Sequence, residues 1–354
     1  MVYQAPFSFS YCFLTPPNLD GSGASPRIDC GFITLSFCAQ VATENAIHRP
    51  VLVDAVLSYL APRSGGRYLD CTVGAGGHAS AILSVAGPTA ILVGIDADEK
   101  ILVIAKERLM PFGDAASLRH GNFADLTQIL SEPNNRGFDG ILFDLGVSSM
   151  QLDQAERGFS FRFDAPLDMR LDQSQPLSAA HLVANLSESE LRELLFSFGE
   201  ESRARRIAHA IVETRAKTPI VTTLQLAAII ARIVPGGRTN PATKTFQALR
   251  IAVNRELEAL KLGIKAAHGA LADGGRLAVI TFHSLEDRIV KQYFAGQANP
   301  CTCPPRTPIC ICGRTARLEL VTRKSIVATS AELDANPRSR SARLRVASRI
   351  GPPL

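Results

Sequence analysis

A glycine-rich run between a short strand and a helical segment constrains the fold of this chain more than any other feature. The run is Thr72-Val-Gly-Ala-Gly-Gly-His78, and a strand is predicted over residues 67–71 before it. Glycines at such a junction let the backbone approach a ligand, and the start of the following helix offers N–H groups to an anion. The junction therefore predicts a nucleotide-type loop in an α/β fold.

Strands and helices alternate on both sides of this loop. Residues 50–60 show helical apolar spacing, residues 90–95 read as a buried parallel strand, and strand patterns follow at 117–120 and 138–145. From about 151 to 240 the pattern is helical. One amphipathic helix is predicted over about 242–272, followed by a strand over 276–282. We predict a doubly wound, Rossmann-like α/β sheet with an inserted all-helical domain.

The predicted domain organisation follows from these patterns. It comprises an N-terminal extension over 1–46, an α/β domain built from 47–151 and 241–300, a helical substrate-binding insertion over 152–240, and a loop-rich basic tail over 301–354. The extension is rich in Pro, Ser and Gly and lacks the basic start and apolar run of a secretory signal. We expect it to be disordered and to serve no targeting role.

The bulk composition indicates the setting in which the chain works. No apolar run approaches the roughly 20 residues that a membrane span needs, and the formal net charge is +5. A mildly basic balance permits a polyanionic partner without requiring one. A chain of 354 residues does not need its eight cysteines as disulfides, so we expect a cytoplasmic location.

Residues beyond the glycine loop complete a candidate ligand site. Asp96 ends a strand roughly twenty residues after the loop, where a carboxylate can hold two ribose hydroxyls. Asp144 ends another strand and precedes a small-residue loop. Phe123 is a candidate to pack on an adenine face or to be a core residue, and Gln151 is a candidate hydrogen-bond donor or a surface residue.

The glycine loop alone does not identify the ligand. Its Gly74-x-Gly76-x-x-Ala79 spacing also satisfies the dinucleotide fingerprint. A nicotinamide-dependent oxidoreductase with a helical substrate domain therefore remains an alternative on this evidence. A non-catalytic RNA-binding or ribosome-assembly protein that retains the fold is a second alternative.

A set of short segments, taken in order along the chain, is more specific than any one motif. The segments are His48-Arg-Pro-Val-Leu52, Asp70-Cys-Thr-Val-Gly-Ala-Gly-Gly-His78, Asp144-Leu-Gly-Val-Ser-Ser149, Asp168-Met-Arg170, Ala242-Thr-Lys-Thr-Phe-Gln-Ala-Leu-Arg-Ile-Ala-Val-Asn-Arg-Glu256, Phe282-His-Ser-Leu-Glu-Asp287 and Asn336-Pro-Arg-Ser-Arg-Ser-Ala-Arg343. Together they resemble the bacterial small-subunit (16S) ribosomal RNA cytosine-N4 methyltransferases, the RsmH or MraW family. The extension before His48 departs from that family, whose members begin close to this motif.

The resemblance implies an S-adenosylmethionine-dependent methyltransferase that modifies the exocyclic N4 amine of a cytidine near the decoding centre. It implies small-subunit ribosomal RNA as the partner, either naked or as an assembled 30S subunit. It also implies cofactor contacts from Gly76, Gly77, His78, Asp96, Phe123, Asp144 and Gln151. Asp144 is our candidate catalytic residue, because an acceptor beside the amine N–H would make the nitrogen a better nucleophile. His283 and His48 are further candidates for substrate or cofactor contact, with a structural histidine as the alternative.

Two clusters of residues suggest contacts outside this site. Basic residues gather over 203–217 and again at Arg338, Arg340, Arg343 and Arg345, and they are candidates to bind RNA phosphates. Cys301, Cys303, Cys310 and Cys312 could supply four thiolates to one zinc ion. Their C-x-C spacing differs from the usual C-x₂-C, and Pro304-Pro305 stiffens the loop. We therefore predict thiols in a turn and no metal site.

Overall fold

The structure is a computed structural model that describes residues 50–351 apart from 131–136, 235, 237–239, 305–308 and 310. The predicted extension over 1–46, His48 and Cys310 therefore lie outside the described residues. No helix in the described part of the chain is long and apolar enough to cross a membrane.

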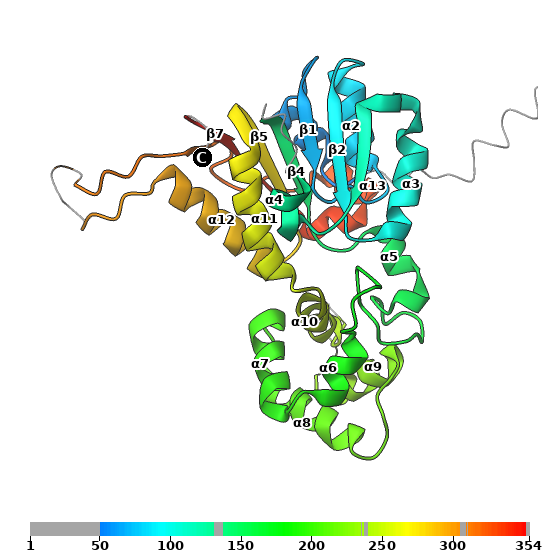
Figure 1. Ribbon diagram of the computed structural model, residues 1–354. Helices are drawn as coiled ribbons and strands as arrows, with labels where there is room; N and C mark the ends of the chain where they lie inside the picture. Colours follow the sequence, from blue (N-terminus) through cyan, green and yellow to red (C-terminus); the bar gives the residue numbers. More distant parts are fainter. Residues whose placement is uncertain are drawn as a thin grey trace, which may run out of the picture. The chain divides into compact units, whose positions relative to one another are not determined.

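Among the described residues, seven strands form one mixed sheet in the order β3-β2-β1-β4-β5-β7-β6 (Figure 1). Strands β1 to β5 are parallel, and β7 runs antiparallel to both β5 and β6. Their bounds are β1 Arg67–Asp70, β2 Ile91–Asp96, β3 Ala116–His120, β4 Phe138–Asp144, β5 Leu271–Thr281, β6 Leu318–Leu320 and β7 Arg343–Arg349. The strand order reverses between β1 and β4, so a ligand crevice is expected at their carboxyl ends.

Helices pack on both faces of this sheet. Successive residues of β5 alternate between the two faces, with Leu277 and Val279 in one hydrophobic core and Ala278 and Ile280 in the other. One core contains residues of α1 (Val53–Leu60), α2 (Gly77–Ala86) and α3 (Glu99–Leu109). The other contains residues of α4 (Leu126–Ile129), α11 (Glu256–Ala270) and α12 (Ser284–Ala298). The sheet is therefore the middle layer of an α/β/α domain.

A third hydrophobic core belongs to the helices that follow β4. They lie together in Figure 1, away from the sheet, and their buried side chains run from Phe159 to Val253. After the short α5 (Ser149–Asp153), the bounds are α6 Ala179–Asn185, α7 Glu188–Gly199, α8 Ala204–Arg215, α9 Thr223–Ala231 and α10 Thr243–Asn254. The capping box predicted at Ser187 is present, since its side chain accepts from the Glu190 N–H and Glu190 accepts in return.

The single helix expected over about 242–272 is two helices, which corrects the prediction. Arg255 adopts a left-handed conformation (φ 49°) and ends α10, and α11 begins at the next residue. The break turns the apolar stripe, so that Phe246 and Val253 enter the helical core while Leu260 enters a core of the sheet. The helical unit therefore extends through Asn254, beyond the expected boundary at 240.

The loop-rich tail expected over 301–354 also differs from the structure. Its later part forms β6, α13 (Ser330–Ala335) and β7. Strand β7 lies between β5 and β6, and its apolar Leu344 and Val346 are buried. The arginines of β7 alternate with these apolar residues, which is the period-two pattern of a strand, and the prediction of an RNA-binding arginine cluster overlooked it.

Candidate active site

The glycine loop brings the start of α2 to the crevice. Gly74 has φ 51°, and its N–H donates to Oδ2 of Asp96 at 2.8 Å. Gly76 has φ 79°, which L side chains rarely adopt. A Cβ on Gly77 would lie 2.6 Å from Cγ of Pro50. Only glycine therefore fits at these positions without movement, and the backbone of the loop faces the site directly.

Three carboxylates meet at the carboxyl edge of the sheet, because Asp70, Asp96 and Asp144 end the neighbouring strands β1, β2 and β4. Burial raises the pKa of Asp70 to about 7 and that of Asp96 to about 6. Burial also raises the pKa of Asp144 well above its usual range, and the charges of Asp70 and Glu286 add to the effect.

The oxygen atoms of this carboxylate cluster show what it can bind. Oδ2 of Asp70 and Oδ1 of Asp144 are buried and accept no hydrogen bond from the described residues. Buried acceptors without donors are costly, and a positive ligand beside them would favour the ionised carboxylates. The cluster is therefore suited to a cationic ligand with donor groups.

His78 lies against this cluster as a neutral ring. Its Nε2 is 2.9 Å from the carbonyl oxygen of Val51, so Nε2 must carry the proton, and burial lowers the pKa of His78 to about 4. Nδ1 then presents its lone pair to Oδ2 of Asp144 at 3.5 Å. This pairing suits a protonated Asp144, so His78 positions that carboxyl group without adding a positive charge.

Asp70 and Thr72 are site residues that the sequence reasoning missed. The Thr72 N–H donates to Oδ1 of Asp70 at 3.1 Å, and Oγ1 of Thr72 accepts from the Asp144 N–H at 2.6 Å. Thr72 therefore ties the glycine loop to β4. The signal for Asp70 was available, because it ends a strand as Asp96 and Asp144 do.

Gln151 lies in the wall of the site, with both ends of its amide engaged. Oε1 accepts from the Ser148 N–H at 2.8 Å, and Nε2 donates to Oδ2 of Asp98 at 2.9 Å. Arg157 donates to the same Asp98 oxygen at 2.7 Å and is 1% exposed. In this structure Gln151 holds the loop after β4 in place through a buried ion pair.

Phe123 follows β3 and packs against one hydrophobic core of the sheet. Its half-buried ring packs edge-on against Phe143, with centroids 5.4 Å apart. A cavity of about 110 Å³ has in its lining the residue that follows Asp96 and the residue that precedes Phe123. The residues lining this cavity are Ala97, His120, Gly121, Asn122, Leu171, Asp172, Gln175 and Asn254. Asp96 and Phe123 themselves do not line this cavity, whereas the helical unit contributes Leu171, Asp172, Gln175 and Asn254 to its wall.

His283 has a structural role in the described residues. It caps α12, with Nδ1 accepting from the Glu286 N–H at 3.4 Å, and Nε2 lies 3.0 Å from Oε1 of Glu286 without hydrogen-bond alignment. Glu286 accepts in turn from the Phe282 N–H at 2.8 Å. These contacts favour the hydrogen-bonded structural histidine over a ligand contact.

Several basic residues expected to meet RNA are tied to the protein instead. Arg345 pairs with both oxygens of Asp287 at 2.7 and 3.0 Å, and Arg338 pairs with Asp153 at 2.9 Å. In α8, Arg215 donates to two backbone carbonyls. The exposed basic side chains of the two clusters include Arg205, Arg206, Arg340 and Arg343.

Comparisons with known proteins identify the family of the chain. Residues 45–350 match the MraW methylase family. The ribosomal RNA small subunit methyltransferase H of Citrifermentans bemidjiense is 53% identical over 311 residues, which is 87% of this chain and all of that protein. The Trichlorobacter lovleyi protein of the same name is 52% identical over 86% of this chain and 98% of its own. A solved rRNA methylase from Streptococcus thermophilus aligns over 84% of this chain and 94% of its own, with 13% sequence identity and a TM-score of 0.35. The chain therefore belongs to the MraW methylase family and is an S-adenosylmethionine-dependent methyltransferase.

Proposed function

We propose that the protein transfers a methyl group from S-adenosylmethionine to the exocyclic N4 amine of a cytidine in 16S ribosomal RNA, near the decoding centre. Its relatives over most of the chain are named ribosomal RNA small subunit methyltransferases. The sequence segments quoted above resemble enzymes that modify this amine. We expect the protein to act in the cytoplasm, where ribosomal subunits are assembled.

The carboxylate cluster is the observation that carries the proposal for the cofactor. S-adenosylmethionine is a sulfonium cation with an amino group and two ribose hydroxyls, so it offers the charge and the donors that the cluster lacks. We propose that it is held by Gly76, Gly77, His78, Asp96, Phe123, Asp144 and Gln151, with Asp70 as an addition. In this arrangement Asp96 holds the ribose, and the cavity lined by Ala97 and Asn122 takes the adenine.

Asp144 is the proposed catalytic residue. The amine of cytosine is a poor nucleophile because its lone pair is delocalised into the ring. Oδ1 of Asp144 could accept from one amine N–H and favour the pyramidal nitrogen, while His78 and Thr72 fix the orientation of Asp144. The cofactor supplies an electrophilic methyl group. As the nitrogen forms its bond to that methyl, the sulfur–carbon bond breaks, and the amine proton is released to solvent.

The loop after β4 and the helical unit are proposed to receive the RNA. Gly146, in the loop after β4, has φ 93° and lies beside Phe282 and Arg250. The exposed Arg205 and Arg340 provide charges for phosphates. Such contacts position RNA without reading its sequence, which leaves the choice of base to the site itself.

The deciding experiment is to incubate 30S subunits and naked 16S rRNA, both lacking the modification, with the enzyme and labelled S-adenosylmethionine. We expect digestion and mass analysis to find the label as N4-methylcytidine. Label on another atom, or none on either substrate, would contradict the proposal. An Asp144→Ala variant, which lacks the acceptor oxygen, would support the assigned role if it binds the cofactor normally but methylates much more slowly, whereas an unchanged rate would remove it.

A further inference from the structure

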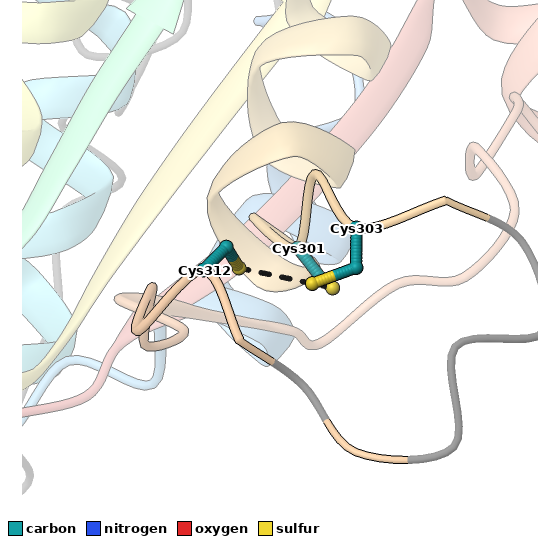
Figure 2. Close-up of side chains that lie close together, drawn as sticks. All are labelled: Cys301, Cys303 and Cys312. Carbon is teal, nitrogen blue, oxygen red and sulfur yellow. Dashed lines mark hydrogen bonds between the residues drawn. The ribbon is translucent and has the colours of Figure 1, made fainter.

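Three cysteine side chains converge in the segment between α12 and β6. Sγ of Cys301 lies 3.9 Å from Sγ of Cys312, and Cys303 completes a group whose sulfur atoms all lie within 4.8 Å of one another (Figure 2). Cys301 and Cys303 come from one stretch of the segment and Cys312 from another (Figure 2). The fold therefore brings together thiols that are eleven positions apart in the sequence.

The separation of the sulfur atoms fits thiolates that share one metal ion. Two thiolates at about 2.3 Å from one zinc, at the tetrahedral angle, lie about 3.8 Å apart. A disulfide would instead require a sulfur–sulfur distance of about 2.05 Å. Thiolates on an iron–sulfur cube bind different iron atoms and lie farther apart. The observed 3.9 Å between Cys301 and Cys312 thus matches a mononuclear tetrahedral site.

The backbone around the group supports the same assignment. The Ile311 N–H donates to Sγ of Cys303 at 3.4 Å. A backbone donor of this kind stabilises a thiolate and orients it as a metal ligand. The C-x-C spacing does not prevent a shared metal ion, because the chain turns enough for Cys301 and Cys303 to present their sulfur atoms to one point.

The segment has little else to hold it in place. None of its described residues between 299 and 317 is buried, and the side chains of Ile309 and Ile311 are 77% and 81% exposed. A chain segment without a hydrophobic core usually needs a covalent or metal cross-link to keep one conformation. At its carboxyl end, the Arg317 N–H donates to the carbonyl oxygen of Gln297, so a backbone hydrogen bond joins the two ends of the segment.

We propose that Cys301, Cys303 and Cys312 bind one structural Zn²⁺ that clamps the segment between α12 and β6. Cys310 lies outside the described residues, and the proposal rests on the other three cysteines. A water molecule or a further cysteine would complete the four positions of the ion.

The test measures the metal content of the full-length protein. We expect elemental analysis to find about one zinc per chain, and we expect Cys301→Ser/Cys303→Ser/Cys312→Ser to lose it. The matched control is Cys12→Ser/Cys30→Ser/Cys38→Ser, which removes the same number of thiols elsewhere and should keep the zinc. Zinc retained by the first variant, or lost equally from both, would overturn the proposal.

A second measurement does not depend on how the variants fold. Cobalt added to zinc-depleted wild-type protein should give the intense visible bands of a tetrahedral thiolate site, and zinc should abolish them. Cobalt bands of octahedral type, or iron with labile sulfide in the purified protein, would refute a zinc–thiolate site.

Discussion

Replacement of Asp70 with Asn should make the protein without cofactor more stable while it weakens cofactor binding. Burial raises the pKa of Asp70 from 3.8 to about 7. The folded chain therefore holds a proton between these pH values that the unfolded chain has lost, and stability falls as the pH rises through this window. At about 1.4 kcal/mol per pKa unit, ionised Asp70 costs at most about 4 kcal/mol above pH 7. Asn does not titrate and avoids this cost.

The same substitution removes a negative charge from the site proposed to hold a cation. A hydrogen bond to a charged group contributes about 1.5–3 kcal/mol, so S-adenosylmethionine should bind roughly 10- to 100-fold more weakly at pH 8. In the wild type, affinity should also fall below pH 7, because binding must release a proton from Asp70. This part of the pH dependence should be absent from Asp70→Asn.

The chain contains no Trp, so calorimetry serves better than fluorescence for both measurements. Thermal unfolding and cofactor titration would be run at pH 5 and pH 8 on the wild type and on Asp70→Asn. Asp114→Asn, which makes the same change at an exposed carboxylate, is the matched control. The reasoning fails if Asp70→Asn is destabilised equally at both pH values and binds the cofactor with an unaltered pH dependence.

Five further substitutions test the packing and the basic surface. Arg157→Met should cost about 3–5 kcal/mol in urea unfolding, because it leaves a buried carboxylate without its cation, and a loss below 1 kcal/mol would contradict this. Gly77→Ala should destabilise by about 1–3 kcal/mol through its 2.6 Å clash, whereas Gly296→Ala, with open space around it, should be neutral or stabilising. Arg340→Ala should lower the slope of log RNA affinity against log salt concentration by about one and leave stability unchanged. Arg345→Ala should instead lose about 2 kcal/mol of stability, because Arg345 pairs with Asp287. Equal effects of these two arginine variants on RNA binding would refute the distinction.

The parallel part of the sheet could be predicted from sequence because each of its elements is locally consistent. The buried strand at 90–95, the glycine loop and the following helix carry strong patterns, and they appear as β2, the loop after β1 and α2. The tail could not be predicted in the same way. Strand β7 has the alternating pattern of a strand, but its partner β5 is more than sixty residues away, and nothing local identifies that partner.

The break between α10 and α11 was hidden for a different reason. Arg255 is not a helix breaker, and its left-handed conformation is imposed by the packing of the two helices on different cores. The electrostatics of the candidate site were also beyond sequence reasoning. The pKa of Asp144 is raised by burial and further by the charges of Asp70 and Glu286, and only the folded chain produces that burial and brings these residues close. The positions of Asp96 and Asp144 at strand ends, by contrast, were visible from the pattern alone.

The separate hydrophobic core of the helical unit has a consequence for how the protein unfolds. Residues from Phe159 to Val253 pack mainly on one another, and Arg255 is the point where the chain passes from this core to that of the sheet. Two cores that share few side chains need not lose structure together, so heating should produce two cooperative transitions. Cofactor should then raise the transition of the sheet more than that of the helices, and hydrogen exchange should divide the chain near residues 151 and 255.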